Sequence, residues 1–179
     1  SLGNLLADAL ADTAEVDILL LGSGSIRTKE LGPVVTLNDL ITCFPYNDSL
    51  IRYSLTGAQL KQVFSHIMRP ENRDGEGECY QINSKIKAIY HDSAKELKDL
   101  FFDGQPVDDQ RLYTLGLQGY HANNAADYLN LTLPSSSKVI STSIQDLLIE
   151  YFRSHQNLSA KIEGRLTYLP IPFSGAAKS

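Results

Sequence analysis

The feature that most constrains the fold is a short apolar run, Ile18 to Leu21, that stops in a loop of small residues. An apolar run without polar interruptions is typical of a strand that is buried on both of its faces, and we predict such a strand over residues 16–21. The loop that follows reads Gly22-Ser23-Gly24-Ser25-Ile26-Arg27. Small residues that lead to an arginine directly after a buried strand raise the question of what the loop holds.

The rest of the chain alternates between helical and strand patterns. Apolar residues recur at helical spacing in residues 2–13, 58–68 and 144–152. Thr36 and Asp39 form a capping-box pattern, which predicts a helix through Thr42. Strand patterns cover residues 49–55, 80–82, 86–90, 97–102, 113–117 and 163–169.

These elements predict one mixed domain. Because helices and strands interleave without a repeat, we expect an α+β fold, a mixed sheet with packed helices, over residues 1–169. Residues 70–78 are polar and twice interrupted by glycine, which predicts a mobile surface loop. Residues 170–179 are small and polar, which predicts a disordered tail.

Composition narrows the classes of partner. A formal charge of −5 over 179 residues argues against a surface that wraps nucleic acid or coats an anionic membrane. No apolar run approaches the ~20 residues that span a bilayer. Cys43 and Cys79 are too few for a disulfide framework, so we expect two buried thiols first and a single bridge second. The chain starts at Ser1 without a signal pattern and resembles an excised piece.

Catalytic patterns are absent from the sequence. The four histidines lie in separate predicted elements without metal-ligand spacing. The Gly/Ser loop is neither a G-x-S-x-G nucleophile elbow nor a P-loop. We therefore expect no catalytic residue and no metal or other cofactor in this domain.

A binding role has more support. The Gly/Ser loop offers backbone N–H groups, and Arg27 adds a bidentate donor for phosphate or carboxylate, although a plain turn would give the same pattern. Tyr46 and Tyr120 fall in predicted loops from which a ring can project. Two facing rings would clamp a planar base, but each tyrosine alone is also typical of a half-buried packing residue.

The order of these segments resembles the C-terminal domain of 5′-nucleotidases, the family that includes periplasmic UDP-sugar hydrolases and animal ecto-5′-nucleotidase. Residues 2–9, L-G-N-L-L-A-D-A, are similar to its L-G-N-L-x-x-D-A opening. Residues 22–27 resemble its N-G-G-G-I-R loop, residues 44–47 its P-F-x-N segment and residues 113–127 a strand with its N-F-x-x-x-G-G-D loop. Residues 162–166 resemble its closing E-G-R-I strand, so the resemblance runs from residue 2 to about 169.

The resemblance implies a division of labour. In the family, a separate N-terminal metallophosphoesterase domain holds two divalent metal ions and hydrolyses nucleotides, while the C-terminal domain binds the nucleotide or nucleoside. By position, Tyr46 and Tyr120 would sandwich the base, Arg27 would hold the substrate and Gly24 would allow close backbone approach. The resemblance also implies an exported parent protein, in the periplasm, at the cell surface or secreted. A fragment of this kind is not expected to be active alone.

The resemblance is incomplete in the last of these loops. A gapless alignment from Tyr120 places Ala126 at the acidic position, whereas a one-residue insertion restores Asp127. The two glycines are alanines in this chain, and Asn123 and Asp127 are the polar candidates for the ribose side. The alternative hypothesis is a diverged binding or adhesion module without nucleotide recognition, in which Tyr46 and Tyr120 would lie apart or lack a cleft between them.

Overall fold

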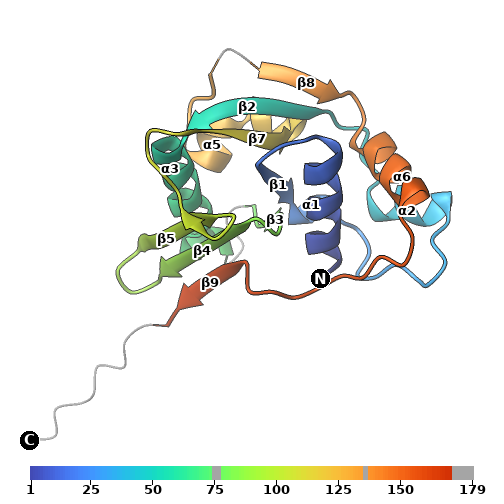
Figure 1. Cartoon of the computed structure of the whole chain (residues 1–179), viewed down its shortest axis with the longest axis horizontal. Helices are drawn as coiled ribbons and strands as arrows, with labels where there is room; N and C mark the ends of the chain where they lie inside the picture. The colour runs from blue at the N-terminus through green and yellow to red at the C-terminus, as the bar shows by residue number, and fades with distance from the viewer. Residues whose placement is uncertain (74–77, 135–136, 171–179) are drawn as a thin grey trace, which may run out of the picture.

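The computed structural model describes residues 1–73, 78–134 and 137–170, and these residues form the predicted α+β fold (Figure 1). The helices are α1 (Leu2–Thr13), α2 (Leu37–Cys43), α3 (Gly57–Ile67), α4 (Gly119–Asn123), α5 (Ala125–Leu129) and α6 (Ile144–Ser154), and a 3-10 turn η1 spans Ser23–Ser25. The strands are β1 (Ile18–Gly22), β2 (Leu50–Thr56), β3 (Tyr80–Ile82), β4 (Ile86–His91), β5 (Glu96–Phe102), β6 (Gln105–Pro106), β7 (Leu112–Gln118), β8 (Ser137–Ser141) and β9 (Leu166–Leu169).

Strand β1 is buried on both faces, as its apolar run predicts. It lies inside a five-stranded sheet of order β3-β1-β7-β2-β8, antiparallel to β3 and parallel to β7. Ile18 and Leu20 join the core that α3 and α5 cover, whereas Leu19 and Leu21 join the core that α1 and α6 cover. The loop after β1 is therefore anchored by a strand that packs into both cores of the domain.

A second sheet contains the last described strand, β9. Its order is β6-β5-β4-β9, and β9 pairs in parallel with β4. Figure 1 shows the segment that leads to β9 passing beside the start of α1. Asn4 in α1 holds this segment, because its side-chain amide donates to the carbonyl oxygen of Lys161 at 3.0 Å.

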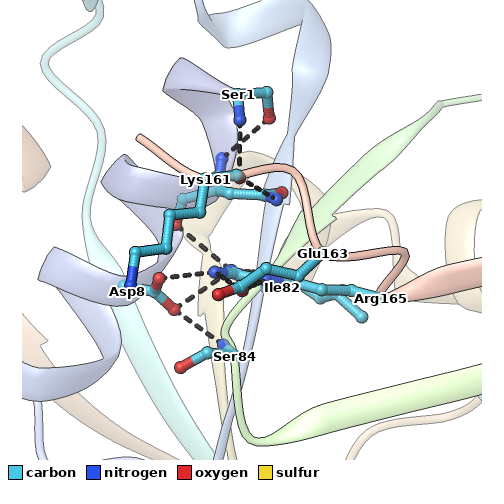
Figure 2. A network of polar contacts seen from close by, with 8 residues as sticks. Ser1, Asp8, Ile82, Ser84, Lys161, Glu163 and Arg165 are labelled. Carbon is cyan, nitrogen blue, oxygen red and sulfur yellow. Dashed lines mark hydrogen bonds and ion pairs between the residues drawn. The ribbon is translucent and has the colours of Figure 1, made fainter. Parts of the chain in front are cut away.

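Arg165, just before β9, is the centre of a network of polar contacts (Figure 2). Its side chain is 5% exposed, and its two Nη atoms donate to the carboxylate oxygens of Asp8 at 3.0 and 2.6 Å. Nη2 also donates to Glu163 at 2.9 Å, and Nη1 donates to the carbonyl oxygen of Ile82 at 2.6 Å. Asp8 accepts a further bond from the Ser84 backbone N–H at 2.7 Å. One guanidinium therefore joins α1, the turn after β3 and the approach to β9.

Several boundaries differ from the prediction. Residues 70–73, predicted as part of a mobile loop, are helical, and the rest of that predicted loop includes residues 74–77, outside the described residues. The closing strand begins at Leu166 and not at residue 163. The predicted tail lies almost wholly in residues 171–179, also outside the described residues. Cys43 is buried as expected, but Cys79 is exposed, and no disulfide joins the two.

The segment after β7 is helical where the sequence indicates a loop. Residues 119–129 form the two short helices α4 and α5, joined at Asn124, whose φ is −120°. Alanines at 125 and 126 suit this conformation, because alanine favours helical backbone and disfavours positive φ. The left-handed residue comes later, at Asn130, with a φ of 51°. Tyr120 therefore projects from a helix.

Candidate functional site

An open cleft of about 480 Å³ lies where β1 and β7 end. Its walls come from residues 24–25 after β1, residues 46–48 after α2 and Glu78 before β3, together with side chains from the end of β7 through α5, namely Gln118, Tyr120, His121 and Tyr128. The cleft combines tyrosine rings with a few polar groups, which is typical of a small-molecule site.

Tyr46 and Tyr120 line this same cleft, although 73 positions of the chain lie between their segments. Both rings are accessible, at 41% and 56% exposure. Asp48, two residues after Tyr46, joins the two segments, because its carboxylate accepts from the Tyr120 N–H at 3.2 Å and from the Ser49 N–H at 2.8 Å. The Tyr120 ring is held further by Tyr128, whose hydroxyl lies 3.2 Å from its own. The structure thus places two accessible tyrosine rings on one cleft.

The buried side chain of Gln118, which is 2% exposed, holds the loop after β1 through two hydrogen bonds. Its side-chain oxygen accepts from the Gly22 N–H at 2.8 Å, and its amide nitrogen donates to the Ser25 hydroxyl at 2.9 Å. The Ser23 N–H donates to the carbonyl oxygen of Cys79 at 2.7 Å. These bonds fix the 3-10 turn at the cleft wall.

The sequence predicts that backbone N–H groups of this loop bind a ligand, but in the structure the Gly24 N–H is bonded to Glu78. Its Oε1 accepts from the Gly24 N–H at 3.0 Å. A Cβ built on Gly24 would meet the same carboxylate at 3.4 Å, an ordinary contact. In this structure the group that approaches the Gly24 backbone is Glu78, and close approach of a substrate to Gly24 stays a prediction.

His121 lies at the centre of an aromatic cluster under the cleft and is 2% exposed. The rings of Tyr80, Tyr120 and Tyr128 pack edge-on around it, with centroid distances of 5.2, 5.5 and 5.0 Å. Its Nε2 is 3.6 Å from Glu78 Oε2, and neither ring nitrogen makes a hydrogen bond with the described residues. A buried imidazole without hydrogen bonds is costly, which makes the 3.6 Å contact with Glu78 the main polar interaction of this ring.

The absence of a side chain at Gly22 makes room for this imidazole. A Cβ on Gly22 would lie 2.4 Å from His121 Cε1. The family loop that residues 22–27 resemble usually begins with asparagine or another small polar residue, and the sequence alone indicates only that Gly22 lacks that side chain. Glu78, His121, Gln118 and Asp48 were not predicted as site residues, because none belongs to a pattern on its own.

The other predicted site residues lie at different distances from the cleft. The Arg27 guanidinium lies over the Tyr46 ring, 5.6 Å from its centroid, but Arg27 is not among the residues that line the cleft. Asn123 and Asp127 are exposed on α4 and α5, outside the cleft lining. The structure brings Gly24, Tyr46 and Tyr120 together and leaves these three at the periphery.

The Glu78 carboxyl titrates below the ordinary glutamate value. Burial raises its pKa, but the adjacent His121 imidazole and the N–H groups of Gly24 and Ser23 outweigh burial and lower the pKa. A lowered folded-state pKa means that ionised Glu78 stabilises the fold fully above the unfolded-state pKa, and that this contribution is lost as pH falls through the folded-state value.

We therefore expect Glu78→Gln to be less stable than wild type at pH 7, and the difference to shrink as pH falls below the ordinary glutamate range. Thermal unfolding of both proteins at pH 7, 5, 4 and 3 measures it. A difference that stays constant down to pH 3 would contradict the assignment of these contacts to the ionised form.

Metal and membrane features are not found in the described part of the chain. No three His, Cys, Asp or Glu side chains of residues 1–73, 78–134 and 137–170 are grouped to hold a metal ion. In the cleft itself, the Asp48 carboxylate is already used by two backbone N–H groups. Among the described helices, none is long and apolar enough to cross a membrane.

Comparison with known proteins identifies the fold. The chain is 24% identical over 166 residues to a probable 5′-nucleotidase of Treponema pallidum, covering 86% of this chain and 28% of that protein. Its structure is similar to a 5′-nucleotidase precursor from Thermus thermophilus, with a TM-score of 0.76 at 19% identity, over 96% of this chain and 36% of that one. NAD nucleotidase of Haemophilus influenzae gives a TM-score of 0.70 at 19% identity, over 92% and 32%.

The chain therefore spans about a third of the length of these proteins. The sequence model of the 5′-nucleotidase C-terminal domain matches residues 1–131, which is more than half of the chain. The sequence motifs, the fold and this match agree, and the chain belongs to the 5′-nucleotidase C-terminal domain family.

Proposed function

We propose that this chain is the substrate-recognition domain of a 5′-nucleotidase-type metallophosphoesterase and that it binds the nucleoside part of a nucleotide between Tyr46 and Tyr120. The observation that carries the proposal is the arrangement of these two exposed rings on one cleft, with Asp48, two residues after Tyr46, bonded to the Tyr120 backbone N–H. The alternative of a diverged binding module expected the two rings apart or without a cleft, and no observation favours it.

Stacking supplies the affinity in this proposal. Each base–aromatic stack contributes about 1 to 3 kcal/mol in single-stranded nucleic-acid sites. Because Asp48 and Tyr128 restrain the backbone and ring of Tyr120, little conformational entropy is lost when a base enters. Arg27, over the Tyr46 ring, adds positive charge near the cleft for an anionic part of the substrate, and Asn123 and Asp127 would meet only ligand groups that extend beyond the cleft.

Hydrolysis is assigned to a separate catalytic domain. In the proposed parent enzyme, an N-terminal domain with two divalent metal ions would activate water and stabilise the phosphoryl charge, and this domain would present the nucleotide to it. Relatives named 5′-nucleotidases support that role, and a relative from snake venom supports a location outside the cytoplasm. The isolated chain is expected to show no metal-dependent phosphatase activity.

Calorimetric titration of the chain with nucleosides and AMP tests the proposal. We expect Tyr46→Ala and Tyr120→Ala each to weaken nucleoside binding by about 1 kcal/mol or more, roughly fivefold or more. Tyr46→Phe and Tyr120→Phe are the matched controls, because they keep the ring and remove only the hydroxyl. Binding that neither alanine substitution changes would place the site elsewhere, and the absence of any nucleoside binding would overturn the proposal.

A further inference from the structure

The charge of the cleft differs from what a phosphate site requires. Two carboxylates, Asp48 and Glu78, contribute to its lining, whereas no lysine or arginine is among the described residues that line it. The Gly24 N–H, a backbone group of the kind that binds phosphate, is already bonded to Glu78 Oε1. A second anion in that position would be repelled at close range, so this wall of the cleft suits a hydrogen-bond donor.

The two carboxylates are not equivalent. Both oxygens of Asp48 accept backbone N–H groups, from Ser49 and from Tyr120, and so serve the structure of the cleft. Glu78 accepts from the Gly24 N–H on Oε1, and its Oε2 lies 3.6 Å from His121 Nε2, so the carboxylate keeps acceptor capacity that these contacts do not use. Its side chain keeps 21% of its surface exposed. Glu78 therefore offers free lone pairs to the cleft.

The position of this carboxylate is fixed. Gly24 holds Oε1, and the His121 ring stands beside Oε2 with three tyrosine rings packed around it. The imidazole is buried among these rings, and the nearest polar partner of its Nε2 is Glu78, at 3.6 Å. A fixed acceptor discriminates between ligands more strongly than a mobile one, because an unmatched ligand leaves it unpaired.

We propose that Glu78 is a specificity-determining residue, which accepts hydrogen bonds from N–H or O–H donors of the nucleoside bound between Tyr46 and Tyr120, with His121 as its positioning residue. The proposal rests on the proposed function. Two parts of a nucleoside carry such donors. A guanine base presents N1–H and the 2-amino group side by side and matches both oxygens of a carboxylate, and a ribose presents two adjacent hydroxyls.

A ligand series separates the two sources. Guanosine, inosine and purine riboside share the ribose and the stacking rings but present two, one and no base donors on this edge. In 2′,3′-dideoxyguanosine, the base donors remain and the two ribose hydroxyls are removed. Calorimetric titration of the chain with these four compounds measures which part of the nucleoside Glu78 reads.

Glu78→Gln is the test variant, because its shape is unchanged and one oxygen can still accept from Gly24 while the other becomes an amide donor. We expect guanosine to bind wild type about tenfold more tightly than the analogue that lacks the donors bound by Glu78, which is purine riboside for the base or 2′,3′-dideoxyguanosine for the ribose. We expect Glu78→Gln to lose most of that preference. Glu96→Gln, an exposed glutamate on β5, is the matched control. Near-ultraviolet circular dichroism establishes that each variant is folded, and Glu78→Asp, which keeps the charge, is the second variant.

Each outcome decides between the hypotheses. Affinity that falls from guanosine through inosine to purine riboside, or that falls when the ribose hydroxyls are removed, shows a preference for one set of donors. Loss of this preference in Glu78→Gln supports the acceptor role. If nucleosides bind in a tyrosine-dependent way and Glu78→Gln leaves every preference unchanged, this inference is wrong and the proposed function stands. If no nucleoside binds, or binding ignores both tyrosines, the proposed function fails and the inference fails with it.

Discussion

Replacing Arg165 with alanine is expected to lower the free energy of unfolding by about 3 kcal/mol, which corresponds to roughly 6 to 12 °C in melting temperature for a domain of this size. The guanidinium is 5% exposed and donates to Asp8, Glu163 and the Ile82 carbonyl. Its removal leaves these acceptors without their donor and opens a space under β9. The effect stays at the low end for a buried ion pair, because the Asp8 and Glu163 side chains are 31% and 38% exposed and regain water.

Urea denaturation of wild type and Arg165→Ala measures this difference. Lys61→Ala is the matched control, since Lys61 pairs with Asp109 at 2.7 Å on the surface, with side-chain exposures of 41% and 56%, and its loss should cost less than about 1 kcal/mol. Arg165→Lys should recover only part of the stability, because an ammonium group cannot reproduce the bidentate contact with Asp8. Equal effects of Arg165→Ala and Lys61→Ala would show that the buried network adds nothing beyond a surface pair.

Gly22→Ala is expected to destabilise the domain by about 1 to 3 kcal/mol, the usual range for overpacking a buried site. The added methyl group would lie 2.4 Å from His121 Cε1 and 3.2 Å from both Gln118 and Glu78. The imidazole has no free direction in which to move, because aromatic rings surround it. Thermal and urea unfolding of the single variant measure the cost.

The pair Gly22→Ala and His121→Ala shows whether this contact is the cause. His121→Ala alone should also destabilise, because it leaves a cavity, but it removes the atom that the new methyl group would strike. We expect the double variant to be more stable than the sum of the two single effects by about 0.5 to 3 kcal/mol. Strict additivity would mean that Gly22 is required for another reason, such as the 3.2 Å contacts that a Cβ would make with Gln118 and Glu78.

The sequence predicts most of the scaffold because its signals are local. The apolar run Ile18 to Leu21 needs burial on two sides, and Thr36 with Asp39 forms the predicted capping box at the start of α2. Helices α1, α3 and α6 each bury one face, which gives them a helical period. Local signals of this kind survive in any tertiary context that offers the matching surface.

The elements that were missed lack such a period. Helices α4 and α5 have five residues each, too few for an amphipathic pattern, and burial of His121, Ala125 and Leu129 holds them in place. Strand β8 pairs only with β2 at the sheet edge, so its residues 137–141 show no alternation of burial. Tertiary packing determines the conformation of the α4–α5 segment and of β8, and local sequence patterns do not show that packing.

The site was predictable only where a family resemblance supplied it. Tyr46 and Tyr120 came from matching segments, and the structure places them on one cleft. Glu78 and His121 meet across segments that are far apart in the sequence, and each residue taken alone reads as an ordinary polar side chain. Their proximity depends on the order of β3, β1 and β7 in the sheet, which no local pattern specifies.

The central position of β1 has a consequence for biosynthesis. Ile18 in β1 pairs with Leu115 in β7, which lies 97 positions later in the chain. At roughly 5 to 20 residues per second, a ribosome needs about 5 to 20 s to supply this partner. During that interval β3 is the one neighbour in the sheet that β1 can pair with, and the other edge of its apolar run is open to the pairing that leads to aggregation. The central position of β1 therefore exposes its leucines during synthesis until β7 is made, before the cleft exists.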